Sequence, residues 1–228
     1  MSEQQQSLTV DIVSDVVCPW CFIGQKRLRR AIEMVPDVAI HIRWRPFQLD
    51  ATIPAGGMDR KQYMLSKFGS EERLREIHAR IEPLGETEGI KFDFGAIKVS
   101  PNTLDAHRII RWAASAGDGV QDRLARRLFE LYFEEGRNVG DHAVLVEAAL
   151  EAGMDAALVE SLLPTDADRD AVAAEAATAS RMGITGVPCF LFENKYAVMG
   201  AQDAETLASA IRQLADAKAR GELDKVAQ

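Results

Sequence analysis

A pair of cysteines three residues apart, in the stretch Cys18-Pro19-Trp20-Cys21, constrains the fold of this chain more than any other feature. Residues 8–13 alternate apolar and polar side chains, which predicts a strand. A helical pattern begins just after Cys18. The pair is therefore expected to lie where a strand ends and a helix begins.

This position gives the two thiols different chemistry. Proline is favoured at the first residue of a helix, so Pro19 makes Cys18 the residue that caps the helix. The free amides of Trp20 and Cys21, with the helix dipole, are expected to stabilise a thiolate on Cys18 and to lower its pKa below about 8.5. Cys21 lies nearly one turn further along, within disulfide range. We therefore predict an exposed Cys18 that forms a mixed disulfide and a more buried Cys21 that resolves it.

Two other roles for the pair are a zinc half-site and a purely structural pair. Tetrahedral zinc requires two more ligands with comparable spacing, and the chain offers only Cys189 and four scattered histidines. Redox chemistry is therefore favoured, with no metal and no bound cofactor. Asp15 lies three residues before Cys18. Its carboxylate either destabilises the Cys18 thiolate or caps the loop, and the sequence does not decide between these roles.

Composition and charge narrow the class of protein. A chain of 228 residues buries enough surface to fold without disulfides, and an odd count of three cysteines specifies no disulfide framework. The 27 basic and 35 acidic residues give a net charge of −8, which repels nucleic acid. The sequence contains no run of about 18 apolar residues, so it predicts no membrane-spanning helix. Met1–Gln6 lacks the features of a secretory signal, so we expect a cytoplasmic protein.

Three changes of pattern divide the chain. A second alternating run covers residues 38–44 and stops at Pro46, and helical periodicity then extends from about residue 54 to residue 183, enough for five or six helices. Strand character returns at residues 189–192 and 196–199, and a last helical pattern follows. The predicted order is β-α-β, a helical block, then β-β-α.

The two flanking parts are each too small for a stable core, which predicts one domain with an insertion. The fold class is α/β. Residues 7–50 and 184–228 are expected to form one domain together, and residues 51–183 an all-helical insertion.

A proline at the returning strand supports this interpretation. Pro188 lacks an amide donor and must open the strand or lie at its edge. Together with the cysteine pair and the order of elements, Val187-Pro188 matches the thioredoxin fold, in which a cis-proline loop faces the catalytic cysteines. We predict a cis Val187–Pro188 peptide bond.

Four stretches resemble the DsbA-like thioredoxin-fold proteins that carry a helical insertion, specifically the FrnE-like branch. They are residues 14–21, 100–108, 186–196 and 200–202. The resemblance implies a thiol-disulfide oxidoreductase or disulfide isomerase. It implies a nucleophilic Cys18, a resolving Cys21 and a cis-proline at Pro188. The backbone of Val187 would pair with an extended substrate, and Pro19 and Trp20 would tune the pair.

The same resemblance implies partners and alternatives. Substrates would be proteins or small molecules that carry thiols or disulfides, and glutathione or a thioredoxin-type dithiol would exchange electrons with the pair. The broader group contains 2-hydroxychromene-2-carboxylate isomerases and kappa-class glutathione transferases, which have a serine near the position of Cys18. A glutathione-dependent isomerase or transferase, and a chaperone-like binding protein with a redox switch, are therefore the alternatives. Trp20 stands where strong oxidants have histidine, which predicts a lower potential than the value of about −120 mV for DsbA.

Two further residues have open roles. Cys189 follows Pro188 directly and is either a small buried hydrophobe or a third redox thiol. His107 lies at the edge of an apolar helical stripe and is either a packing residue or a contact for substrate or glutathione.

Overall fold

The computed structural model describes residues 6–223. Two expectations from the sequence fall partly outside this range. Residues 1–5, which belong to the stretch examined for a secretory signal, and residues 224–228, the end of the predicted C-terminal part, lie outside the described residues.

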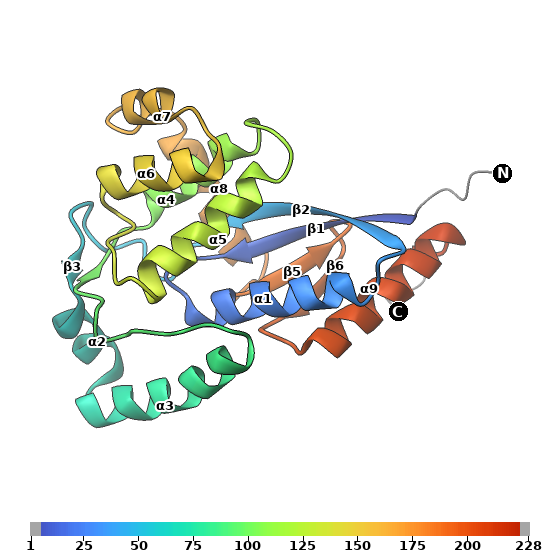
Figure 1. Cartoon of the computed structure of the whole chain (residues 1–228), viewed down its shortest axis with the longest axis horizontal. Coiled ribbons are helices and arrows are strands. Elements are labelled where there is room, and N and C mark those ends of the chain that lie inside the picture. The colour runs from blue at the N-terminus through green and yellow to red at the C-terminus, as the bar shows by residue number, and fades with distance from the viewer. Residues whose placement is uncertain (1–5, 224–228) are drawn as a thin grey trace.

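A four-stranded sheet in the order β2-β1-β5-β6 forms the centre of the molecule (Figure 1). Strand β1 (Gln6–Ser14) pairs in parallel with β2 (Val38–Pro46). Strand β5 (Cys189–Phe192) pairs antiparallel with β1, and β6 (Tyr196–Met199) pairs antiparallel with β5. The predicted β-α-β and β-β parts of the thioredoxin fold are confirmed.

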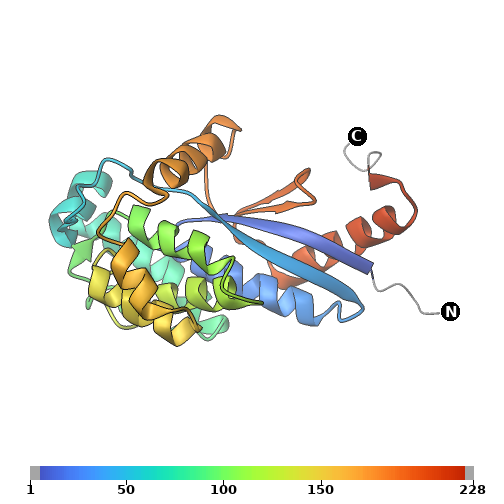
Figure 2. The same cartoon turned by 90° about the horizontal axis from the view of Figure 1, so that it is seen from above.

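One face of the sheet is apolar and is covered by two helices. Leu8, Val10 and Ile12 of β1 are buried and lie in register with Ile40, Ile42 and Trp44 of β2. Helices α1 (Pro19–Glu33) and α9 (Ala204–Ala219) pack against each other on one side of the sheet (Figure 2). The alternation read from the sequence therefore marks the face that α1 and α9 cover.

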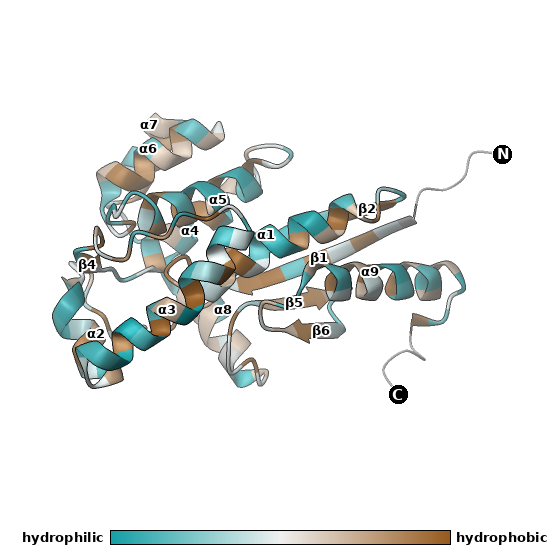
Figure 3. Ribbon diagram, turned by 60° about the horizontal axis from the view of Figure 1, so that its bottom comes forward, coloured by the Kyte–Doolittle hydropathy of each residue, from teal (hydrophilic) through white to brown (hydrophobic). Residues whose placement is uncertain are grey.

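The insertion contains seven helices among the described residues, more than the five or six expected. They are α2 (Arg60–Phe68), α3 (Glu71–Thr87), α4 (Leu104–Ala113), α5 (Val120–Phe133), α6 (His142–Ala152), α7 (Ala156–Leu162) and α8 (Arg169–Arg181). The chain breaks between α2 and α3 because Gly69 adopts a φ of 93° and Ser70 Oγ accepts the amide of Arg73 at 3.2 Å. Figure 3 shows α2 and α3 together at one end of the molecule.

The insertion is not wholly helical, contrary to expectation. Strands β3 (Met58–Asp59) and β4 (Val99–Ser100) form a short antiparallel pair. Two-residue strands carry no alternation that a sequence pattern can detect, because alternation becomes visible only over four or more residues. This pair joins the start of α2 to the segment before α4.

Aromatic rings connect the insertion to the rest of the fold. Phe22 of α1 stacks on Phe129 of α5 with ring centroids 5.3 Å apart, and Trp44 of β2 lies 6.0 Å from the same ring. Phe92 meets Phe133 edge to face at 5.4 Å. One continuous hydrophobic core thus extends through both parts. The boundaries predicted for the two parts remain a prediction.

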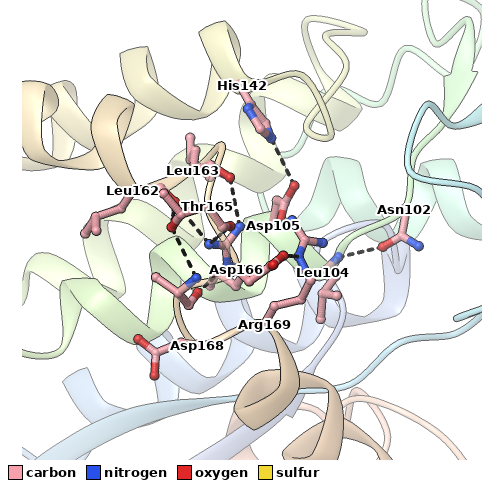
Figure 4. A network of polar contacts seen from close by, with 12 residues as sticks. Asn102, Leu104, Asp105, His142, Leu162, Leu163, Thr165, Asp166, Asp168 and Arg169 are labelled. Atoms are coloured by element: carbon pink, nitrogen blue, oxygen red, sulfur yellow. Dashed lines mark hydrogen bonds and ion pairs between the residues drawn. The ribbon is translucent and has the colours of Figure 1, made fainter.

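The stretch from residue 100 to residue 108 organises the insertion. Arg108 is fully buried and donates hydrogen bonds to the backbone carbonyls of Leu162, Leu163, Thr165 and Ala167 and to Asp105 Oδ1. Asp105 also lies 3.0 Å from His142 Nε2 and 3.1 Å from the Arg169 guanidinium (Figure 4). These contacts hold α4, α6 and the loop between α7 and α8 together.

None of the helices among residues 6–223 is long and apolar enough to cross a membrane.

Candidate active site

The cysteine pair lies where the sequence predicts it, at the start of α1. Cys18 caps the helix with an extended backbone, and Pro19 is the first helical residue. The amide of Cys21 donates to the carbonyl of Cys18 at 3.0 Å. Both side chains are free thiols, as is Cys189. The two thiols therefore lie close together at the first turn of α1.

The environment of Cys18 differs from the prediction. Its exposed fraction is 4%, so the prediction of an exposed Cys18 is wrong. The expected hydrogen bonds from helix amides to the sulfur are absent. The thiol instead donates to the carbonyl of Val187, with Sγ and O 3.7 Å apart. The Val187–Pro188 peptide bond is cis, as predicted, and this loop covers the sulfur.

Burial separates Cys21 from Cys18 chemically. Burial raises the pKa of the Cys21 thiol well above its ordinary value, and its hydrogen bond with Cys18 and the charge on Cys18 raise it further. Hydrogen bonds from the Ser14 side chain and the Asp15 backbone lower the pKa of Cys21, but their effects are smaller. Cys21 therefore keeps its proton at neutral pH. Of the two cysteines, only Cys18 belongs to the residues that line the adjacent cavity.

A cavity of about 460 Å³ opens beside Cys18. One wall comes from the active-site loop, including Val17, Pro19 and Trp20, and from Val187. The opposite wall comes mainly from α2 and α3. Apolar side chains on this side are Ile53, Met64, Phe68, Ile77, Ile81 and Phe94. Trp20 lines the cavity and is 39% exposed.

Several residues of this cavity carry no local signal in the sequence. Arg60 lies at the start of α2, Tyr63 follows on the same helix, and Tyr132 belongs to α5. They come from distant parts of the chain, and only tertiary packing brings them to Cys18. Burial raises the pKa of Tyr132 to about 12. Its spacing on the helix carries no signal that its hydroxyl end lines a cavity.

Asp15 links the active-site loop to the insertion. Its carboxylate is buried, and Oδ2 accepts the amide of Leu49 at 2.8 Å. Oδ1 lies 3.5 Å from His107 Nε2, and that nitrogen lies 2.9 Å from the carbonyl of Phe47. Since a carbonyl only accepts, the ring nitrogen donates to Phe47. His107 is buried and does not line the cavity beside Cys18, so it reaches the site through Asp15.

Cys189 faces away from the cysteine pair. A Cβ added to Gly24 of α1 would lie 2.7 Å from Pro188 Cγ and 3.2 Å from Phe190 Cζ, so both side chains face α1. Alternation along β5 then directs Cys189 to the other face of the sheet. Cys189 is fully buried, and burial raises the pKa of its thiol. These are the properties of a small buried hydrophobe.

Within the described part of the chain, no group of three or more His, Cys, Asp and Glu side chains is arranged to hold a metal ion.

Comparison with known proteins places this geometry in a family. The family of the DSBA-like thioredoxin domain matches residues 9–212. The chain is 29% identical over 191 residues to the uncharacterised protein YwbO of Bacillus subtilis, covering 80% of this chain and 85% of that protein. A probable DsbA oxidoreductase of Streptomyces coelicolor has a TM-score of 0.78 and 29% identity, covering 90% and 89% of the two chains.

A more distant likeness concerns the fold alone. The cytosolic disulfide reductase DsbM of Pseudomonas aeruginosa, solved with glutathione, has a TM-score of 0.62 and 18% identity. The match covers 90% of this chain and 98% of that one.

Proposed function

The chain belongs to the DSBA-like thioredoxin family, and from this premise we propose that it is a thiol-disulfide oxidoreductase and isomerase in which Cys18 and Cys21 perform the chemistry. The observation that carries the proposal is the pair of free thiols in the first turn of α1, with Cys18 directed at the carbonyl of Val187. Protein disulfides and small disulfides are the substrates.

The reaction begins with attack on a substrate disulfide. The thiolate of Cys18 bonds to one substrate sulfur, and the other substrate sulfur leaves with the bonding electron pair and takes up a proton. Loss of the Cys18 proton also frees the carbonyl of Val187. An extended substrate segment then pairs with the backbone at Val187. Pro19 and Trp20 set the environment in which this mixed disulfide forms.

Cys21 completes the transfer. It loses its proton and attacks Cys18 Sγ, which breaks the mixed disulfide and releases the substrate as a thiol. Two electrons have then passed from the pair to the substrate, and the pair is a disulfide. Glutathione or a thioredoxin-type dithiol returns the electrons, in the cytoplasm, as the name and bound glutathione of DsbM suggest by analogy.

Slow resolution favours isomerisation. The raised pKa of Cys21 keeps the population of its thiolate small, so the mixed disulfide on Cys18 persists. A second thiol of the same substrate then has time to attack it and to form a different disulfide. This sequence releases Cys18 with no net transfer of electrons, which is the isomerase reaction.

Reduction of insulin disulfides tests the proposal. Cys18→Ser is expected to abolish the activity, and Cys21→Ser is expected to accumulate mixed disulfides on Cys18. Cys189→Ser is expected to retain activity, because Cys189 faces away from the pair. Insulin reduction by the Cys18→Ser variant would refute the proposal.

Two other assays test the alternative functions. An isomerase or transferase activity that survives in Cys18→Ser would support the glutathione-dependent alternative. Suppression of aggregation without either cysteine would support the chaperone-like one.

A further inference from the structure

The cavity beside Cys18 has the features of a binding site for a particular kind of molecule. We infer that it binds a small organic disulfide, or the corresponding thiol, with an apolar body and a carboxylate that pairs with Arg60. This inference rests on the proposed function and names a substrate class for the same site.

The size and the walls of the cavity indicate the body of the ligand. Small-molecule sites usually enclose about 300–1,000 Å³, and this cavity of about 460 Å³ falls within that range. Its far wall is formed by aliphatic and aromatic side chains of α2, α3 and the segments beside them, including Ile81 and Phe94. An aromatic or aliphatic body removes this surface from water, which a strongly polar peptide does not.

Arg60 indicates the charge of the ligand. A guanidinium carries five N–H donors. One nitrogen of Arg60 donates to Tyr132 Oη at 2.7 Å, and the group lies 5.5 Å from the centre of the Tyr132 ring. Among residues 6–223, no carboxylate lies within ion-pair distance of Arg60. Its remaining donors are therefore available to a carboxylate, the partner that the planar group fits best.

The other charged groups around the cavity make contacts of their own. Lys67 donates to Tyr63 Oη at 2.9 Å, and Asp50 accepts hydrogen bonds from Thr52 and Tyr63. His78 stacks on Phe94, and burial, followed by the charge of Arg60, lowers the pKa of His78, so its ring is neutral at pH 7. Arg60 and Lys67 are the two cations that line this cavity, and neither lies within ion-pair distance of a carboxylate among the described residues. Of the two, Arg60 has the planar set of donors that matches a carboxylate.

The Asp15 carboxylate gives the ligand a direction. Asp15 belongs to the loop of Cys18 and repels a carboxylate. The sulfur end of the ligand therefore lies toward Cys18, and its carboxylate lies toward Arg60.

The redox step balances with the groups already described. Cys18 attacks one sulfur of the ligand disulfide, and the other half leaves as a thiolate. Cys21 then attacks Cys18 Sγ and releases the bound half as a second thiolate. Two protons convert both halves to thiols, and the two electrons come from the Cys18–Cys21 pair.

Three disulfide probes test this inference in a background that carries Cys21→Ser and Cys189→Ser, so that Cys18 is the single thiol. The probes are dithiobis(nitrobenzoate), which is aromatic and anionic, dithiodipyridine, which is aromatic and neutral, and cystamine, which is cationic. The second-order rate constant of Cys18 is measured with each probe. Arg60→Gln is expected to slow the anionic probe about tenfold, the value of one charge-assisted contact, and to change the neutral probe less than about twofold.

Lys61→Gln is the matched control. Lys61 is adjacent in sequence and has the same charge, but it pairs with Glu71 at 2.7 Å and does not line the cavity. It is expected to leave all three rates unchanged. An equal loss in Lys61→Gln, or an equal effect of Arg60→Gln on all three probes, would overturn the inference. A parent protein whose Cys18 reacts with no probe would instead refute the proposed function.

Discussion

Among single residues, Cys21 has a thiol whose pKa is raised by burial, so it limits the second half of the proposed reaction. The thiolate is the attacking species, and below the pKa its population rises tenfold for each pH unit. In the proposed reaction Cys18, which lines the cavity, reacts first, and the pH then sets how long the mixed disulfide survives.

The reaction with dithiobis(nitrobenzoate) makes this difference measurable. Attack by Cys18 releases the first nitrothiobenzoate, and attack by Cys21 on the mixed disulfide releases the second. We predict that the rate of the second phase rises about tenfold per unit between pH 6 and pH 8, because only the thiolate of Cys21 attacks. Stopped-flow absorbance follows both phases, and Cys21→Ser should lack the second one. A second phase independent of pH would contradict the prediction.

Part of the site could be predicted from short stretches of the sequence. The spacing of Cys18 and Cys21, and the proline at position 188, each involve only a few neighbouring residues. The cover over Cys18 and the placing of Arg60 at the cavity depend on contacts between segments far apart along the chain. His107 illustrates the same limit, because its partner Asp15 lies 92 positions earlier.

At the scale of elements, Gly24 allows α1 to approach the proline loop. A Cβ at this position would lie 2.7 Å from Pro188 Cγ, so we predict that Gly24→Ala lowers the free energy of unfolding by about 1–3 kcal/mol, the usual cost of overpacking. Denaturant unfolding measures the change. Gly56→Ala is the control, since no atom lies within 4 Å of an added Cβ there. A Gly24→Ala variant as stable as the parent would show that the contact does not constrain α1.

Arg108 holds the elements of the insertion together through its buried guanidinium. We predict that Arg108→Met lowers the free energy of unfolding by about 3–5 kcal/mol, because it leaves buried carbonyls and Asp105 without their donor. Arg111→Met removes a guanidinium that is 46% exposed and pairs with Asp168 and Glu175. That loss should stay below about 1 kcal/mol. Equal effects of the two variants in urea titrations would contradict this role for Arg108.

The elements themselves were largely predictable, because long runs with a period of two or of 3.6 residues identify strands and helices. The runs at 8–13 and 38–44 gave β1 and β2 correctly. The short β3–β4 pair was missed because it depends on pairing between segments about 40 residues apart. The count of helices was low because short helices such as α7 (Ala156–Leu162) carry little periodicity.

At the scale of the whole molecule, the insertion and the thioredoxin part share one core and enclose the cavity between them. The insertion therefore shapes what reaches Cys18. Aromatic contacts such as Phe22 on Phe129 fix its position relative to α1. No pattern in the sequence specifies how distant segments of the chain enclose a cavity. The shape and lining of the cavity that would select a substrate therefore could not be predicted from the sequence.

Equilibration in glutathione buffers, followed by thiol labelling and mass spectrometry, tests whether Cys18 and Cys21 form one redox-active pair. We predict a disulfide between these two residues with a midpoint of about −180 to −270 mV, below DsbA, because Trp20 supplies no cationic imidazole. Cys189→Ser should leave the midpoint unchanged. A pair that stays reduced in oxidised glutathione would refute the proposed redox pair. A midpoint near the DsbA value of about −120 mV would refute the effect expected from Trp20.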